Sequence, residues 1–186
     1  MELGRDLFML SFYLIGINTA DLYDVDEINR NRLEYKRRKT TTRRKDKAFI
    51  SILIEPEARL LIDKYADPSG ERIFKFYRMY ASSKGFNNAI NTGLRELAEL
   101  LALPDDLTSY YVRHSWATIA RNLAGVSKDD VAMAMNHVDA THQVTDIYIK
   151  PDWSHIDKAN EKVLKIFRTS TNPETTEVAF MQFFEH

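Results

Sequence analysis

Residues 24–56 constrain the fold most, because here the chain changes from helical periodicity to strand-like alternation. The turn signal Asn29-Arg30-Asn31 lies between two short runs in which apolar and polar residues alternate. A β-branched run at residues 48–54 follows and ends just before Pro56. With a second turn at residues 39–45, these three runs predict a small three-stranded antiparallel sheet.

Most of the remaining sequence has the periodicity of amphipathic helices. Leu3, Leu7, Leu10 and Leu14 recur at spacings of three and four, which predicts a helix over 2–16. Further helices are expected at 20–23, 56–66, 83–103, 108–125, 127–135 and 154–168, with a short one carrying Tyr148. The segment 67–71 is typical of a loop, and 72–77 of a short extended piece. The predicted fold class is therefore α+β and mainly helical.

The chain has 186 residues, enough for one domain with a substantial core. We assign residues 1–168 to that domain and 169–186 to a polar linker followed by an apolar tail. The crowded apolar side chains of the tail need a groove, either on this domain or on a neighbouring copy. The first residues already have the pattern of a core helix, so we interpret the chain as a piece of a longer protein.

Two absences from the sequence exclude classes of protein. The chain has no cysteine, which excludes disulfides and thiolate metal sites. No apolar run approaches the ~20 residues that cross a bilayer. The apolar N-terminal stretch has acidic flanks and no small-residue cleavage site, which favours a buried helix over a signal peptide. We expect a cytoplasmic protein with no membrane partner.

The charge of the chain is distributed unevenly. Residues 29–47 contain ten basic and two acidic residues, so this stretch carries +8 while the rest of the chain carries −9. Such asymmetry predicts one face that meets phosphate groups. The alternative is a solvated basic hairpin that binds nothing.

The helix expected at 108–125 places a guanidinium beside an apolar stripe. Thr108 or Ser109 is its predicted N-cap, and Tyr110 and Arg113, three residues apart, share a face. Either an anion binds there, or Arg113 pairs with a carboxylate such as Asp21 inside the protein. His114 is expected to point away from that face and to be structural.

Four pieces of the sequence follow one another in a recognisable order. They are "YKRRKT" in the basic hairpin, "YYVRHSWAT" at a helix start, "MNH" at a helix end, and Tyr148, eleven residues after His137. This order resembles the tyrosine recombinases, the phage-integrase family, and looks most like the integrases of conjugative transposons. The resemblance covers about residues 5–165, the whole catalytic domain of that family.

The resemblance implies the fold and an activity. A chain of this family cuts and rejoins duplex DNA through a 3′-phosphotyrosine intermediate, with no metal or cofactor. Tyr148 would be the nucleophile, Arg113 and His137 would bind the phosphate, and Lys39 would protonate the leaving 5′ hydroxyl. Tyr110 stands where the family has the histidine of its H-x-x-R-H motif.

The resemblance also implies partners. Duplex DNA would lie against the basic hairpin, and the DNA contacts are assigned to Arg37, Arg38, Arg43, Arg44 and Lys45. The family works as a tetramer on DNA, so other protomers are expected as partners, with a monomer in isolation. The N-terminal DNA-binding domain that the family joins to this domain is absent from the sequence.

The chain departs from the family pattern at three positions. Asn18 replaces the first arginine, Tyr110 replaces a histidine, and Asn136 replaces the glycine before His137. We expect another cation to replace the arginine missing at Asn18, and the sequence offers three candidates: Arg43, Arg44 and Arg95.

Two other functions stay open at this point. Asn18 and Tyr110 favour a catalytically degenerate module that binds DNA without cutting it. The second rival is an interaction domain that never meets DNA. Each residue singled out also has a plainer interpretation: a helix C-cap for His137, ordinary core for Tyr148, and a surface lysine for Lys39.

Overall fold

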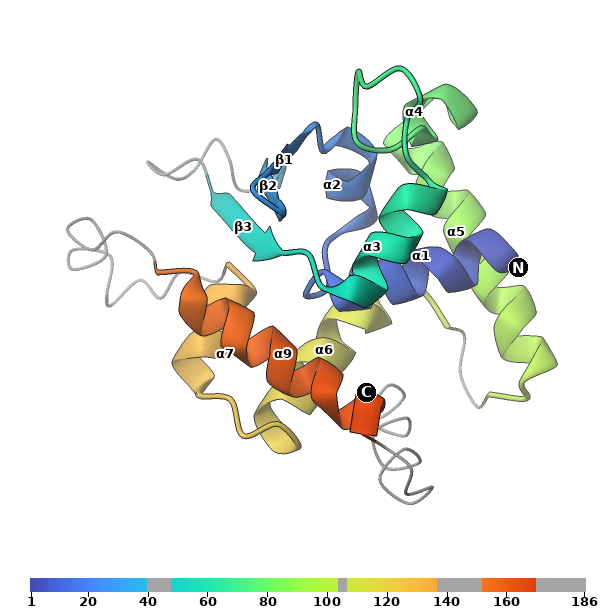
Figure 1. Cartoon of the computed structure of the whole chain (residues 1–186). Coiled ribbons are helices and arrows are strands. Elements are labelled where there is room, and N and C mark those ends of the chain that lie inside the picture. The colour runs from blue at the N-terminus through green and yellow to red at the C-terminus, as the bar shows by residue number, and fades with distance from the viewer. Residues whose placement is uncertain (40–47, 104–106, 137–151, 170–186) are drawn as a thin grey trace.

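The structure is a computed structural model that describes residues 1–39, 48–103, 107–136 and 152–169. In chain order its elements are α1 (Glu2–Tyr13), α2 (Thr19–Asp24), β1 (Glu27–Asn29), β2 (Arg32–Lys36), β3 (Phe49–Leu53), α3 (Pro56–Lys64), α4 (Phe76–Met79), α5 (Ser83–Leu100), α6 (Tyr111–Asn122), α7 (Lys128–Ala134) and α9 (Ser154–Thr169). The structure is mainly helical with one small sheet (Figure 1), so the predicted α+β class is confirmed.

The three strands form an antiparallel sheet in the order β1-β2-β3, as predicted. Leu33 of β2 pairs with Ile28 of β1 and Ile52 of β3. The β1–β2 hairpin turns at Arg30 and Asn31, whose φ angles are +46° and +63°. Positive φ at both central residues is the geometry that matches the twist of two paired strands. Most of the second predicted turn, at 39–45, lies outside the described residues.

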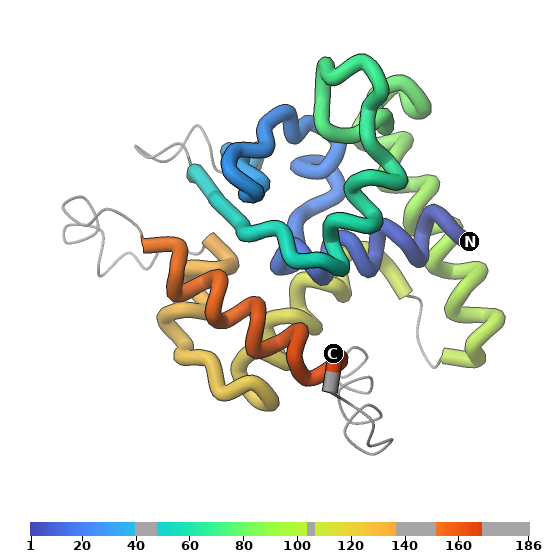
Figure 2. Tube along the Cα trace, in the orientation of Figure 1, coloured from blue at the N-terminus to red at the C-terminus, as the bar shows by residue number. Residues whose placement is uncertain are grey.

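Helix α1 lies in the middle of the molecule and contacts α3, α5 and α6. Figures 1 and 2 show the sheet at one edge and α5 at the opposite edge, with α6, α7 and α9 grouped beneath them. Gly4 brings α1 against α5, because a Cβ there would lie 2.9 Å from main-chain atoms of Gly93 and Ile90. Only a residue without a side chain permits this approach.

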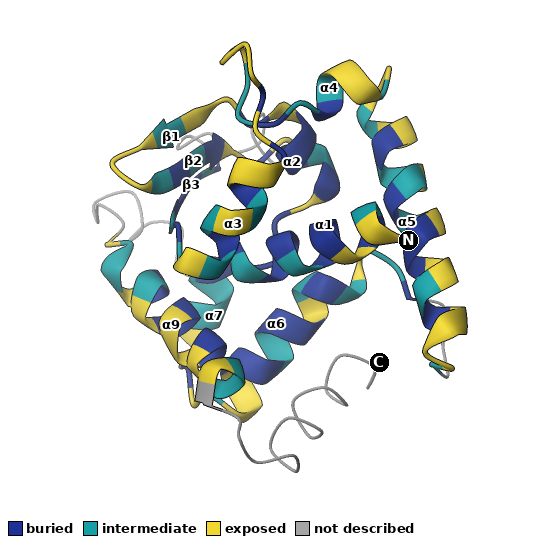
Figure 3. Ribbon diagram, turned by 45° about the vertical axis from the view of Figure 1, so that its right-hand side comes forward, coloured by how far each residue is buried: buried dark blue, intermediate teal, exposed yellow. Residues whose placement is uncertain are grey.

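Apolar side chains of several elements meet around α1. In Figure 3 the helices have their buried residues on the sides that face one another. Leu10 and Leu14 are fully buried, as the leucine spacing predicts, and so is Trp116 of α6. The Trp116 Nε1 donates to the Asn160 side chain at 2.9 Å, and Asn160 Nδ2 donates to the Tyr13 carbonyl at 2.9 Å. This buried asparagine therefore joins α9 to both α6 and α1.

The expectation of an extended piece at 72–77 is wrong. Phe74 makes a single bridge with Ala66, and α4 already begins at Phe76. The rings of Phe74 and Phe76 stack at 5.1 Å, and Phe76 stacks on Phe86 at 4.5 Å, all three fully buried. Burial of this aromatic stack in the core decides the backbone here, against the local pattern.

The predicted N-cap of α6 is also wrong. The cap is Tyr110, with no side-chain capping hydrogen bond. Ser109 instead bonds to α5: its main-chain N–H donates to Asn91 Oδ1 at 2.9 Å, and its hydroxyl donates to Asn87 Oδ1 at 3.0 Å. Ser109, predicted as the N-cap of α6, is therefore bonded to polar side chains of α5 instead.

The other helix ends agree with the sequence more closely. Pro56 begins α3. Ser127 caps α7 and accepts from the Asp130 N–H at 3.0 Å, as the capping-box pattern predicts. Helix α9 ends at Thr169, so the linker and tail predicted beyond it lie outside the described residues. Within the described ranges, no helix combines the length and apolar character needed to cross a bilayer.

Candidate functional site

Arg113 lies in the first turn of α6 and bonds to two main-chain carbonyls. Its Nη1 donates to the Gly16 carbonyl at 3.2 Å, and its Nη2 donates to the Met135 carbonyl at the end of α7. Gly16 has a φ of +67°, and a Cβ there would lie 2.7 Å from the Arg113 Cα. The α1–α2 loop therefore packs directly on the backbone that carries this arginine.

Arg37 reaches the same carbonyl from the sheet. Its Nη1 donates to the Met135 carbonyl at 3.3 Å, and the residue is only 9% exposed. The main-chain N–H of Arg37 donates to the Ala48 carbonyl at 3.0 Å, which extends the β2–β3 pairing by one residue. Arg37, assigned above to the DNA contacts, therefore has a buried side chain rather than an exposed one. The period of two along a strand turns it inward with Leu33 and Tyr35.

Asp21 is the buried carboxyl near this arginine pair. It is 6% exposed, and its Oδ1 accepts the main-chain N–H of Arg38 at 2.9 Å. Burial raises the pKa of Asp21, while the Arg38 N–H and the charges of Arg37 and Arg113 oppose that rise. Asp21 therefore offsets part of the positive charge, but it makes no direct ion pair with Arg113 among the contacts of the described residues.

Burial and the nearby charge of Arg37 disfavour the charged form of Arg113. Burial first, and then the charge of Arg37, lower the pKa of Arg113 to about 10. Burial also raises the pKa of the Tyr35 hydroxyl, and the charge of Asp21 adds to that rise. Among the described residues, Asp21 is the carboxyl whose charge acts on both guanidiniums, and a bound anion would be attracted by the same two cations.

Asn136 follows Met135 and ends α7 in the left-handed region, with a φ of +52°. It is 8% exposed, and its Nδ2 donates to the Ala48 carbonyl at 3.2 Å. Asparagine tolerates this backbone better than most residues, so it can stand where a glycine would otherwise be expected. Arg37 and Asn136 thus share the Ala48 carbonyl, and Arg37 and Arg113 share the Met135 carbonyl, so the three residues lie together.

Tyr110 is 69% exposed at the N-cap of α6. Its ring lies 4.5 Å from the ring of His114 in a tilted contact. The expectation that His114 points away from the face of Tyr110 is therefore wrong, since one helical turn brings the two side chains together. No hydrogen bond joins Tyr110 to Arg113 in the described part of the chain.

Some of the remaining assigned residues lie on the surface, and the others lie outside the described ranges. Lys39 is exposed. Arg38 is 60% exposed, and its Nη1 bonds to Asp24 at 2.8 Å and to the Ser83 hydroxyl at 3.2 Å. Five assigned residues lie outside the described ranges: Arg43, Arg44, Lys45, His137 and Tyr148.

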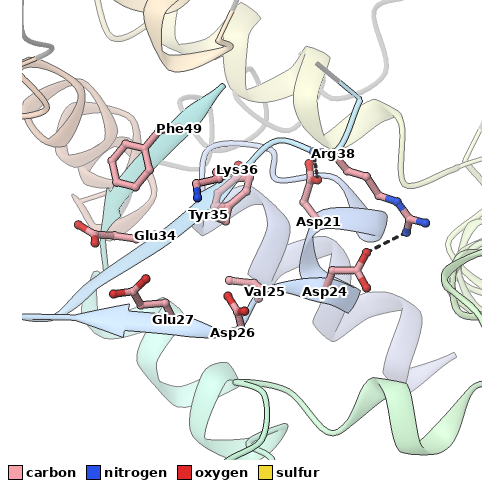
Figure 4. A pocket seen from close by; sticks show the side chains of 10 residues that line it. All are labelled: Asp21, Asp24, Val25, Asp26, Glu27, Glu34, Tyr35, Lys36, Arg38 and Phe49. Atoms are coloured by element: carbon pink, nitrogen blue, oxygen red, sulfur yellow. Dashed lines mark hydrogen bonds and ion pairs between the residues drawn. The ribbon is translucent and has the colours of Figure 1, made fainter. Parts of the chain in front are cut away.

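An acidic hollow of about 610 Å³ lies beside the sheet, and the sequence reasoning missed it. Figure 4 shows its lining residues, which come from α2, the strands and the segments beside them: Asp21, Asp24, Val25, Asp26, Glu27, Glu34, Tyr35, Lys36, Arg38 and Phe49. The run "DVDEI" was the signal for it. Five of its ten lining residues are acidic and two, Lys36 and Arg38, are basic, so the hollow itself disfavours phosphate.

The structure brings to Arg113 a cation that the sequence analysis did not name as a candidate. Of the three candidates for an additional cation, Arg95 is exposed on α5 and donates to Thr92 at 3.4 Å, and the other two lie outside the description. Arg37 is the cation that the fold brings to Arg113. The alternation of Leu33, Tyr35 and Arg37 was the signal that could have found it.

Among the described residues, no group of three or more His, Cys, Asp or Glu side chains is arranged to hold a metal ion. No protein-family model, curated protein or solved structure matches the chain. The function is therefore argued from the residues and their geometry.

Proposed function

We propose that the chain is the catalytic domain of a site-specific recombinase or integrase of a mobile element. It would cut and rejoin duplex DNA through a 3′-phosphotyrosine intermediate. The observation that supports this most is the meeting of Arg37 and Arg113 at the Met135 carbonyl, one residue before Asn136-His137. The order of sequence motifs and the α+β fold agree with it.

The arginine pair suits the charge of the reaction. Attack of the Tyr148 phenolate oxygen on a DNA phosphorus forms a P–O bond and breaks the bond to the 5′ oxygen. Negative charge builds on the equatorial oxygens in between. Arg113 would bind two of these oxygens in a planar fork, and Arg37 would supply the second cation in place of the arginine missing at Asn18.

Proton transfer completes the balance of the step. The Tyr148 hydroxyl would pass its proton to a water that Tyr110 orients, and the leaving 5′ oxygen would gain a proton from Lys39, the proposed donor. His137 would donate a hydrogen bond to a phosphate oxygen. The second half-reaction reverses the roles, with a 5′ hydroxyl attacking the phosphotyrosine, so rejoining needs no ATP.

The arginines are held in place before any substrate binds. Main-chain carbonyls of Gly16 and Met135 hold Arg113, and Arg37, directly after β2, bonds to the carbonyls of Ala48 and Met135. Donors that need no reorganisation stabilise a developing charge best. The mutual repulsion of the pair also favours binding of an anion over an empty site.

A covalent-adduct assay tests the proposal. The protein is incubated with a nicked suicide duplex carrying the target sequence, and the adduct is measured on a denaturing gel. The wild type should form an adduct. Tyr148→Phe should form none while binding DNA within about threefold, because only the nucleophilic oxygen is lost. Adduct formation by Tyr148→Phe at the wild-type yield would exclude Tyr148 as nucleophile.

The second candidate is a DNA-binding module derived from an integrase that no longer cuts. Tyr110 favours it, because its ring lies against His114 and it has no hydrogen bond to Arg113 in the described part of the structure. A gel shift that weakens steeply with salt, together with no adduct from the wild type, would support this candidate. On either proposal the partners are duplex DNA and other protomers, and a cytoplasmic location is proposed with them.

A further inference from the structure

Asn87 of α5 bonds to two segments that are far apart in the sequence. Its Oδ1 accepts from the Thr19 hydroxyl at 2.8 Å and from the Ser109 hydroxyl at 3.0 Å. Thr19 is the first residue of α2, and Ser109 directly precedes Tyr110, the N-cap of α6. One amide oxygen therefore fastens the start of α2 and the start of α6 to α5.

Both fastened segments contact Arg113. Arg113 lies in the first turn of α6, which follows directly on Ser109. Its Nη1 donates to the Gly16 carbonyl at 3.2 Å, in the loop that leads into Thr19. The contacts form a closed ring that runs through α5 and both segments. Its members, all among the described residues, are Asn87, Thr19, Gly16, Arg113 and Ser109.

A second asparagine of α5 strengthens the attachment of α6. Asn91 lies one helical turn after Asn87, and its Oδ1 accepts the main-chain N–H of Ser109 at 2.9 Å. The N-cap of α6 makes no side-chain capping hydrogen bond, so side chains of α5 hold the beginning of this helix. Thr19 is 8% exposed and Asn87 is half-buried, so these hydrogen bonds lie largely out of water, where they are stronger.

We infer that Asn87 is a positioning residue for Arg113 in the proposed strand-transfer reaction, an inference that rests on the proposed function. Gly16 packs on the Arg113 backbone, where an added Cβ would lie 2.7 Å from the Arg113 Cα. Movement of either fastened segment therefore displaces the guanidinium from the place where it would bind phosphate. A misplacement of ~1 Å can cost ~10²-fold in rate. Asn87 acts through Arg113 and does not itself touch the phosphate.

The chain offers two matched comparisons. Asn88 is exposed on α5, so Asn88→Ala changes helix propensity as Asn87→Ala does and leaves both hydroxyl contacts in place. At the other end of one contact, Thr19→Val keeps nearly the shape of the side chain and loses the hydroxyl. Thr19→Ser keeps the hydroxyl and loses a methyl group, so it is the conservative variant that should restore function.

The experiment compares these four variants with the wild type in three measurements. The first is the rate of adduct formation on the nicked suicide duplex at saturating protein. The second is the Kd for the same duplex. The third is hydrogen exchange of the main-chain amides of residues 16–20 and 109–113 without DNA, with residues 156–164 of α9 as the reference. Thermal melting confirms that each variant is folded at the assay temperature.

Asn87→Ala and Thr19→Val should each slow adduct formation about tenfold or more, leave Kd within about threefold, and speed exchange at 16–20 and 109–113 but not at 156–164. Asn88→Ala and Thr19→Ser should behave like the wild type.

Three results would overturn the inference: an equal loss of rate in Asn88→Ala, a Thr19→Ser variant as slow as Thr19→Val, or exchange in Asn87→Ala that is unchanged or faster everywhere. The last would mean either that the two segments are held without Asn87 or that the whole fold is weakened. Absence of adduct from the wild type would overturn the proposed function, and the exchange measurement would still decide whether Asn87 holds the two segments that contact Arg113.

Discussion

Arg37 and Arg113 donate hydrogen bonds to one acceptor, the main-chain carbonyl of Met135. Arg37 directly follows β2, Arg113 belongs to α6, and the carbonyl lies at the end of α7. A helix C-terminus carries partial negative charge, so it is a suitable place to hold two cations. The charge of Arg37 is one of the causes, after burial, that lower the pKa of Arg113.

The first prediction concerns Arg37. Arg37→Ala should lower the rate of adduct formation by ~10²-fold or more, the size expected for one transition-state donor, and leave DNA binding nearly unchanged. Arg38→Ala is the matched control, because the neighbouring arginine is exposed and pairs with Asp24. Full activity of Arg37→Ala, with normal melting, would remove Arg37 from the phosphate site.

The second prediction concerns the shape of the Arg113 group. Arg113→Lys keeps a positive charge but loses the planar fork, so cleavage should fall on the order of 10²-fold or more. A single-turnover assay at saturating protein measures this apart from binding. Near-normal cleavage by the lysine variant would place Arg113 outside the phosphate pocket and leave it a structural role at the Met135 carbonyl.

The third prediction tests the packing of the α1–α2 loop on Arg113. Gly16→Ala forces a side chain into a residue with a φ of +67° and into contact with the Arg113 backbone. Gly70→Ala is the control, because its φ of +70° is similar and nothing lies within 4 Å of the added Cβ. The control should cost about 1–2 kcal/mol of unfolding free energy from backbone strain alone.

Gly16→Ala should cost clearly more than that, because a main-chain clash is added to the same strain. Urea unfolding measures both variants. Equal losses in the two would show that the loop moves away from Arg113 at no cost, and that Gly16 is needed only for its backbone angle.

The fourth prediction concerns acid stability and Asp6. This carboxyl of α1 is 3% exposed and accepts from Lys64 Nζ at 2.5 Å, from Arg5 Nη2 at 2.7 Å and from the Tyr65 hydroxyl at 2.9 Å. Burial opposes ionisation, but the hydrogen bonds from Lys64, Arg5 and Tyr65 outweigh it, and the pKa of Asp6 is lowered. Folding therefore favours the ionised form.

A lowered pKa gives stability that is complete above the unfolded pKa of ~3.9 and is lost as pH falls through the folded value. Asp6→Asn should therefore reduce the unfolding free energy at neutral pH and flatten its fall below about pH 4. Glu99→Gln removes an exposed carboxylate of α5 as a control. If the unfolding free energy of Asp6→Asn falls with decreasing pH as steeply as that of the wild type, other carboxyls cause the acid unfolding.

The sequence by itself determined the elements whose causes are local. The hairpin at Arg30-Asn31, the start of α3 at Pro56 and the cap of α7 at Ser127 each depend on a few neighbouring residues. Helical periodicity in the same way identified the buried leucines of α1. Local propensity and local hydrogen bonds decide such features, so a pattern of residues is enough to find them.

The tertiary structure alone decided which distant groups meet. Arg37 and Met135 are 98 residues apart, and Arg32 and Asp157 are 125 apart, so no local pattern connects them. Core packing also overrode local preference at Phe76, where an aromatic stack made a helical turn out of a predicted extended piece. The energy of these contacts comes from burial and charge between segments that only the complete fold brings together.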